Sequence, residues 1–264
     1  MKIIDKLYQK IPENNRVERI WILARTDFVL RYYGSSLGLL WAFLNPMFRI
    51  LVYYFVFSYL VFKNRDSSFI LYLFIGVITW MFFSQGTKKG MKALNSKRYL
   101  IENIQLNKLD IFYSSVITVS IGFCFNLFIY LLFSQFYHVQ YNWHLLLAPL
   151  LIFNMILLIF GASLILSTLF IFFKDLDHVW DIVLLVGFWT VPIIWDQKFI
   201  FEYYSFMLYV TPITGILINF REIFIYGNPF HWDLFFYDYA YTIFVILVGY
   251  LFFKKFSPLA AQSK

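Results

Sequence analysis

The chain has 264 residues and a formal net charge of +7, yet only 14% of its residues are charged and 61% are hydrophobic. Soluble domains carry about 25% charged residues, so this composition argues against a soluble globule and predicts a membrane protein. The basic residues lie in short stretches between apolar runs, which favours control of membrane topology over nucleic-acid binding. The single Cys124 excludes an intrachain disulfide and argues against a structural zinc site.

Residues 1–34 form a charged arm without the short apolar core and cleavage site of a signal peptide. Within it, apolar and aromatic side chains recur at helical spacing, while most charged ones fall elsewhere on the helix. This pattern is typical of an amphipathic helix in the headgroup plane. A short soluble packing helix is the alternative. The apolar positions are Val17, Ile20, Trp21, Ala24, Phe28 and Tyr32.

The rest of the chain, 35–264, contains six apolar segments of the length needed to cross a hydrocarbon core of ~30 Å. We therefore expect an all-α integral membrane protein with six transmembrane helices. Of the 22 Lys and Arg residues, 17 lie on the side of the arm, the loop 88–109 and the C-terminus, and four lie on the other. Positive charge stays cytoplasmic, so both termini are expected inside. The expected spans are 36–62, 69–87, 110–133, 145–173, 179–195 and 234–253.

Between the last two expected spans, residues 196–232 are too polar to span simply and too aromatic for a plain loop. Two short apolar pieces are separated by Thr211, Pro212 and Gly215, which favours a re-entrant helical hairpin dipping into the outer leaflet. Non-helical backbone at that depth is tolerated only against protein or a water-filled cavity. Two helices lying flat on the membrane surface are the alternative.

The chain carries no GxxxxGK followed by Ser or Thr, so no phosphate-cradling loop of its own is expected. Its four His residues never pair at metal-ligand spacing, and no Ser, His and Asp set suggests a nucleophile. Asp175 and Asp177 resemble a metal-binding Asp-x-Asp pair, but their loop is so short that a solvated turn or a partner contact is favoured. Asp238 is the only obvious intramembrane acid. We therefore expect no enzyme activity, metal or cofactor in this chain.

The first expected span keeps Arg49 although a charge there costs about 3 kcal/mol on insertion scales. Trp41, Asn45, Arg49 and Tyr53 follow one another in i,i+4 steps and share a slowly winding face. Indole, amide, guanidinium and phenol groups on one stripe would suit a wet path for a polar substrate. Pro46 removes a backbone hydrogen bond and can kink the span around such a path. A dimer contact, or snorkelling of Arg49 to the surface, is the alternative.

Three stretches in the expected order resemble the membrane subunits of ABC polysaccharide exporters, which export O-antigen, teichoic acid and capsule chains. "ARTDFVLRYYGSSLGLLWAFLNP" (24–46) resembles the entry into the family's first span. "FKDLDHVWDIVLLVGFWTVPIIW" (173–195) is similar to its charged turn and following span, and "VTPITGILINFREIFIYG" (210–227) to its segment before the last span. The chain departs from the family at Leu106-Asn107, where Phe-Pro is frequent, and at Thr211, where Asn is common.

The resemblance implies a type 2 ABC exporter fold, a homodimer of this chain, and two copies of a partner ABC ATPase that bind Mg-ATP. The loop 88–109 would contain a coupling helix that docks into the ATPase. The segment 196–232 would form the extracytoplasmic gate. The residues implied are Arg98, Tyr99, Glu102 and Asn103 for coupling, and Pro212, Arg221 and Glu222 for the gate.

The cargo implied is a lipid-linked polysaccharide crossing the bacterial cytoplasmic (inner) membrane, with membrane lipids around the chain and no nucleic acid. Arg25, Arg31 or Arg49 would attract its diphosphate, and aromatic faces would let successive sugars slide. An ABC permease for a drug or simple lipid, a stand-alone secondary transporter or channel, and a membrane glycosyltransferase remain alternatives. The expected path residues are Trp41, Asn45, Arg49, Tyr53, Phe188 and Trp189.

Overall fold

The computed structural model describes residues 15–38, 40–61, 68–104 and 106–256, and these ranges contain helices and no strand. The prediction of an all-α protein is therefore confirmed. The longer elements are α2 (Arg16–Tyr32), α3 (Leu40–Tyr54), α4 (Phe69–Ser96), α6 (Lys108–Ser134), α7 (Ala148–Phe172), α8 (Leu176–Thr190), α10 (Pro212–Arg221) and α11 (Trp232–Phe256). The shorter ones are η1 (Phe55–Val61), α5 (Arg98–Ile104), η2 (Gln135–Tyr137), η3 (Trp143–Leu147), α9 (Gln197–Tyr203), η4 (Ser205–Leu208) and η5 (Glu222–Tyr226).

Five helical segments in the described ranges are long and apolar enough to cross a membrane, and they match five of the six expected spans. The exception is the span expected at 179–195. It corresponds to α8, whose 15 residues extend about 22 Å, less than the ~30 Å of a hydrocarbon core. The helix ends where Val191 turns extended, because the following Pro192 disfavours helical backbone at the residue before it. The five segments are Leu40–Ser58, Phe69–Ser96, Lys108–Tyr137, Trp143–Phe172 and Trp232–Phe256.

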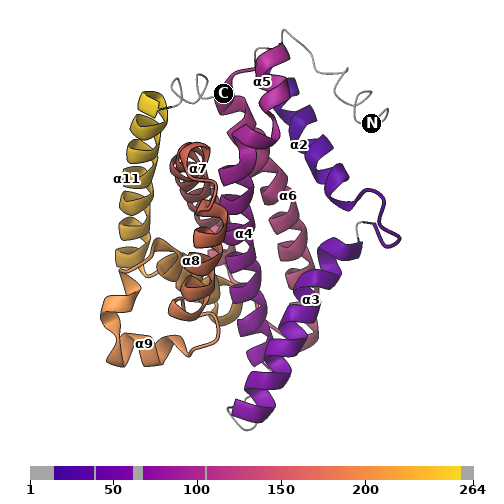
Figure 1. The fold of residues 1–264 in the computed structure, drawn as a ribbon. Helices are drawn as coiled ribbons and strands as arrows, with labels where there is room; N and C mark the ends of the chain where they lie inside the picture. The colour runs from indigo at the N-terminus through magenta and orange to yellow at the C-terminus, as the bar shows by residue number, and fades with distance from the viewer. Residues whose placement is uncertain (1–14, 39, 62–67, 105, 257–264) are drawn as a thin grey trace.

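The central helix is α4, which is buried without interruption from Phe69 to Trp80 and packs against α3, α6, α7, α8 and α10. Its close approach to α7 depends on Gly90, because a Cβ there would collide with the Ser163 side chain. Small residues at such contacts let membrane helices pack backbone to backbone. Figure 1 shows α11 at one edge of the bundle beyond α7, and α2 and α3 at the other edge.

The helix α4 is longer than predicted, since it continues through 88–96 and takes in the first part of the expected cytoplasmic loop. Three lysines made this stretch resemble a loop, but Met91, Ala93 and Leu94 remain buried on its inner face. Lysines can join a helix near a membrane surface because their long stems carry the charge outward. The separate short helix of the loop is α5, which lies at the same end of the bundle as α2 (Figure 1).

The expected re-entrant segment 196–232 contains four short helices, α9, η4, α10 and η5, rather than one uniform hairpin. Its break before α10 lies at Thr211, which is extended, and Pro212 begins the helix. This agrees with the expected break, because proline is well suited to the first turn of a helix. Figure 1 shows α9 at the end of the bundle opposite α5.

Candidate functional site

The helix α2 is attached to the start of α6 by a pair of arginines. Arg16 Nε lies 2.7 Å from Asp110 Oδ1, and Arg19 Nη2 lies 3.0 Å from Asp110 Oδ2. The Asp110 side chain is fully buried, whereas that of Arg16 is half exposed. The hydrogen bond that Arg16 donates to the Asp110 carboxylate raises the pKa of Arg16 above its ordinary value. A buried carboxylate depends on such partners, so Asp110 fixes the first turns of α2 to α6.

A second ionic contact attaches the middle of α2 to α4. Asp27 Oδ2 accepts from Lys97 Nζ at 2.8 Å and lies 3.1 Å from Lys89 Nζ. Nearby, the Thr118 hydroxyl of α6 donates to the Ala24 carbonyl at 3.1 Å. The helix α2 therefore contacts α4 and α6 together, at the end of the bundle where α5 lies (Figure 1).

The helix predicted in the arm is present. Of its apolar positions, Ala24 is buried, whereas Val17 and Trp21 are exposed, and charged side chains make much of the contact with the bundle. Ion pairs allow these charged residues to face protein. The exposed apolar side chains keep the lateral surface that a headgroup-plane helix needs. Residues 1–14 of the arm lie outside the described residues.

The upper part of the expected path lines a small cavity of about 50 Å³ between α3, α4 and α6. Trp41 and Asn45 line it together with Arg31 and Gln85. Arg31 Nη2 donates to Gln85 Oε1 at 2.7 Å. Of the three arginines expected to attract a diphosphate, Arg31 borders this cavity and Arg25 is exposed on α2.

A larger cavity of about 450 Å³ lies between α3, α4 and α8. It brings together four of the six expected path residues from segments that are far apart in sequence. Arg49 and Tyr53 come from α3, and Phe188 and Trp189 come from α8. The helix α4 adds residues that the sequence reasoning missed: Trp80, Ser84, Gln85 and Lys88.

The stripe on α3 is therefore divided between two cavities rather than facing one. Each i,i+4 step rotates about 40° around a helix with 3.6 residues per turn, so four such positions drift steadily. Trp41 and Asn45 turn toward α6, and Arg49 and Tyr53 turn toward α8. Gln85 lines both cavities, which makes the two adjacent along α4.

The walls of the larger cavity combine aromatic faces with positive charge. The rings of Tyr53 and Phe188 lie 5.4 Å apart, and those of Phe188 and Trp189 meet edge to face at 5.6 Å. Arg49 and Lys88 supply the cations, and Asp181, which pairs with Lys88, also lines the cavity, so Arg49 carries the net positive charge; Trp189 remains about half exposed. Guanidinium groups bind phosphate oxygens in pairs, and ring faces stack on apolar faces of sugars. The site can thus hold an anionic group with a polar, ring-bearing chain attached.

Two ion pairs join α4 to α8 at one side of this cavity. Lys88 pairs with Asp181, and Lys92 Nζ lies 2.6 Å from Asp177 Oδ2. Both pairs are spaced by four residues on each helix, so they form two steps of a ladder. The sequence favoured a solvated turn or partner contact for Asp177, and this partner within the chain was missed because it lies 85 positions earlier.

The two charged residues expected in the gate lie side by side in the interior. Arg221 is fully buried; it donates to the carbonyl of Pro192 and, at 2.8 Å, to that of Ile193. Its guanidinium lies 3.3 Å from the Tyr72 ring centroid. Glu222 accepts from Gln197 Nε2 at 2.7 Å. These contacts clamp α10 to α4 and to the segment that follows α8.

The expected coupling residues belong to α5, which is exposed at one end of the bundle. Arg98 and Tyr99 are exposed, with 73% of the Tyr99 surface accessible. Glu102 and Asn103 lie in the same helix. Leu100 packs inward with Leu23 of α2 and Leu106, so α5 and α2 share a small apolar cluster.

Comparison with known proteins supports the membrane assignment. The chain is 27% identical over 204 residues to an O-antigen export system permease protein of Myxococcus xanthus, covering 76% of this chain and 78% of the relative. It is also 27% identical over 217 residues to an O-antigen export system permease protein of Klebsiella pneumoniae, covering 78% of this chain and 80% of the relative. The family model for ABC-2 type transporters matches residues 18–225. This match covers most of the chain, which also has five helical segments long and apolar enough to cross a membrane in its described ranges. The chain therefore belongs to the ABC-2 type transporter family.

Proposed function

We propose that this chain is the transmembrane subunit of an ATP-driven exporter that moves a lipid-linked polysaccharide out of the cytoplasm. The observation that carries the proposal is the cavity between α3, α4 and α8, where Arg49 and Lys88 lie beside four aromatic residues. The relatives named as O-antigen export permeases support the same cargo class.

In this account the diphosphate of the carrier lipid binds first, near the cytoplasmic surface. Arg31 at the smaller cavity and Arg49 at the larger one would bind its phosphate oxygens. The exposed Arg25 would add electrostatic attraction at the protein surface. The sugars would then follow along Trp41, Tyr53, Phe188 and Trp189. Stacking on ring faces is tolerant of sugar identity, so a long chain could slide without strict recognition.

Energy would come from a partner ABC ATPase, present in two copies and binding Mg-ATP. The helix α5, which carries the exposed Arg98 and Tyr99 together with Glu102 and Asn103, is the surface we assign to that partner. The helix α2 would move with it, because they share the cluster around Leu100 and because Asp110 and Asp27 attach α2 to α6 and α4.

A second copy of the chain would complete the pathway. The helix α3 is the least covered of the five candidate spans, with only 17% of its apolar window buried. Its outward side chains Phe48, Leu51 and Val52 are exposed, as are Phe55 at the start of η1 and Ile182 and Leu185 on α8. These surfaces flank the larger cavity and are the ones that a partner copy would cover in the inner membrane, with both termini cytoplasmic.

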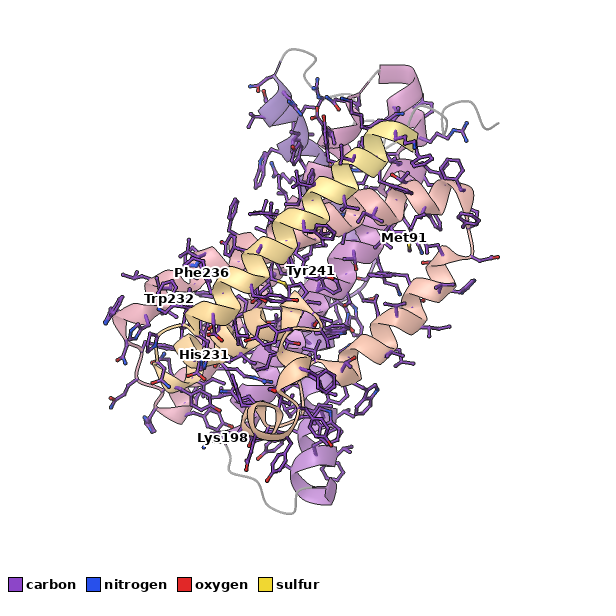
Figure 2. All side chains as sticks on the ribbon, turned by 90° about the vertical axis from the view of Figure 1, so that its left-hand side faces the viewer. Met91, Lys198, His231, Trp232, Phe236 and Tyr241 are labelled. Atoms are coloured by element: carbon purple, nitrogen blue, oxygen red, sulfur yellow. The ribbon has the colours of Figure 1, made fainter. Side chains whose placement is uncertain are left out.

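The segment from α9 to η5 would form the extracytoplasmic gate. Pro212 begins α10, and Arg221 and Glu222 attach its other end to the bundle. The gate would therefore move as one unit, with α10 and η5 moving together, rather than by rotation of single side chains. The helix α9 meets the start of α11 through the rings of Phe201 and His231, which lie 5.3 Å apart; Figure 2 labels Lys198 of α9 below His231 and Trp232.

The test of the assignment is gentle purification of the tagged chain from its native membranes, with mass spectrometry of associated chains and lipids. A stoichiometric ATPase and a co-purifying lipid-linked glycan are expected. An ATPase that co-purifies with a drug or simple lipid would overturn the cargo class. A lone chain that still transports or transfers sugar would overturn the exporter assignment as a whole.

The ladder between α4 and α8 provides a prediction about movement. If the cavity opens between these helices, fixing them together should abolish export. Lys92→Cys and Asp177→Cys, in a Cys124→Ser background, would be joined by a short bis-methanethiosulfonate, and export would be measured before and after reduction. We expect loss on cross-linking and recovery on reduction, with each single-cysteine variant unaffected by the reagent. Full export by the cross-linked protein would contradict an opening between α4 and α8.

A further inference from the structure

Three fully buried polar side chains on α7 and α11 have no role in the account above. They are Asn154 of α7 and Asp238 and Thr242 of α11. Among the described residues, both carboxylate oxygens of Asp238, both amide atoms of Asn154 and the Thr242 hydroxyl have no hydrogen-bond partner. Buried polar atoms are nearly always paired, and four of these five atoms are oxygens, which suit a bound cation better than a bound anion.

The packing of α7 on α11 places Asn154 and Thr242 opposite one another. The two helices run in the same direction, and a Cβ on Gly249 would lie 2.7 Å from the Gly161 carbonyl oxygen. Asn154 and Thr242 each precede one of these glycines by seven residues. Seven residues make nearly two helical turns, so each side chain lies on the same face of its helix as the glycine, and this face packs against the other helix.

The contact between the helices continues beyond this level, and α10 joins it there. The Tyr239 hydroxyl of α11 donates to the Leu150 carbonyl of α7 at 2.7 Å, so the helices have not separated. Asp238 lies one turn from Thr242 on the same face of α11. Its carboxylate contacts Gly215 of α10 so closely that a Cβ on Gly215 would collide with it. Tyr241, the neighbour of Thr242, marks this stretch of α11 in Figure 2.

Asp238 is fully buried, and no ion pair is seen for it among the described residues, so a charged carboxylate at this position requires a positive charge from a bound species. Gly215 lies in the first turns of α10, and the positive end of that helix dipole stabilises a carboxylate. The buried Arg221 is held by the carbonyls of Pro192 and Ile193, so it does not supply the counter-charge. A proton on Asp238 would provide one donor and leave the remaining oxygens unpaired. A small cation would satisfy the carboxylate, amide and hydroxyl oxygens together.

We propose that Asp238, Asn154 and Thr242 bind a monovalent cation, Na⁺, where α10 meets α7 and α11. Oxygen donors of this kind suit hard cations, and one carboxylate balances a single charge. The bound ion would hold α10 against the two long helices. Because α10 belongs to the segment assigned to the gate, a bound ion would also favour the closed gate. This second consequence rests on the proposed function, whereas ion binding itself does not.

The test is the thermal unfolding of the purified protein, with the subunits that accompany it, in NaCl and in N-methyl-D-glucamine chloride at equal ionic strength and pH. A saturating ligand that binds only the folded state should raise Tm by about 5 °C or more. We expect that rise for the natural sequence in NaCl. Equal Tm values in the two salts would overturn the proposal, whether or not Tm then depended on pH.

Variants locate the effect. Asp238→Asn and Thr242→Val are expected to lose most of the sodium-dependent rise in Tm, and Asp175→Asn, an exposed carboxylate at the start of α8, is the matched control that keeps it. If Asp238→Asn does not fold, the salt comparison on the natural sequence and on Thr242→Val still decides. A full rise in Thr242→Val or Asp238→Asn would overturn the site. Because co-purification of an ATPase is scored separately, the ion site and the exporter assignment fail independently.

Discussion

Replacing Arg221 with leucine is expected to lower the free energy of unfolding by about 3–5 kcal/mol, the largest single effect that the structure predicts. The substitution leaves the carbonyls of Pro192 and Ile193 without their buried donor and removes the cation from the face of Tyr72. Three segments, α4, α10 and the end of α8, lose their common contact. Thermal unfolding of the detergent-purified chain should show a Tm lower by about 10 °C.

Two further variants distinguish the effect of the branched guanidinium group from the effect of its positive charge. Arg221→Lys keeps the charge but places a single ammonium where two carbonyls are bridged, so it should recover only part of the loss. Lys198→Leu removes an exposed charge from α9 and should change the free energy of unfolding by less than about 0.5 kcal/mol. If Arg221→Leu had the same Tm as the natural sequence, the buried guanidinium would not be what holds these segments together.

Replacing Asp110 with alanine is expected to release the first turns of α2 from α6. The buried contact with Arg19 is the part that matters, and its loss should cost about 3 kcal/mol, since Arg19 is mostly buried and is left without this partner. Because α2 packs with α5, we also expect the substrate-dependent ATP hydrolysis of the whole complex to fall sharply.

Labelling distinguishes undocking of α2 from general unfolding. Thr26 of α2 is buried, so Thr26→Cys in a Cys124→Ser background should react slowly with a maleimide. Adding Asp110→Ala should speed that reaction, while Glu18→Ala, an exposed change on the same helix, should not. Unchanged labelling in the Asp110→Ala protein would mean that other contacts suffice to hold α2.

The positions of the long helices could be predicted because the bilayer imposes a simple rule of length and hydrophobicity. That rule failed where helix formation and hydrophobicity diverge. The helix α4 continues through Lys88, Lys89 and Lys92, whose side chains reach ion partners, and α8 stops at Val191 although its apolar run continues. Both differences depend on local backbone chemistry and on neighbours that an apolar count does not include.

Part of the cavity could also be predicted from sequence, because i,i+4 spacing identified the α3 face that carries Arg49 and Tyr53. The contribution of α4 could not, since Lys88 and Trp80 meet α8 only through tertiary packing. The ion pairs of Asp110 and Asp177 join residues 85 or more positions apart, and no local pattern encodes such pairs. The coupling, path and gate roles themselves stay predictions.

The central claim is that the cavity between α3, α4 and α8 binds the diphosphate end of a lipid-linked glycan. Its most direct test is stimulation of ATP hydrolysis by that lipid in the reconstituted complex, for the natural chain, for Arg49→Ala, and for Lys254→Ala at the exposed end of α11.

Losing one charge-assisted phosphate contact should raise the lipid concentration for half-maximal stimulation by about 10- to 100-fold in Arg49→Ala. Lys254→Ala should match the natural chain. If ATP hydrolysis by the Arg49→Ala complex were half-maximally stimulated at the same lipid concentration as the natural chain, the assignment of this cavity to the substrate would be contradicted.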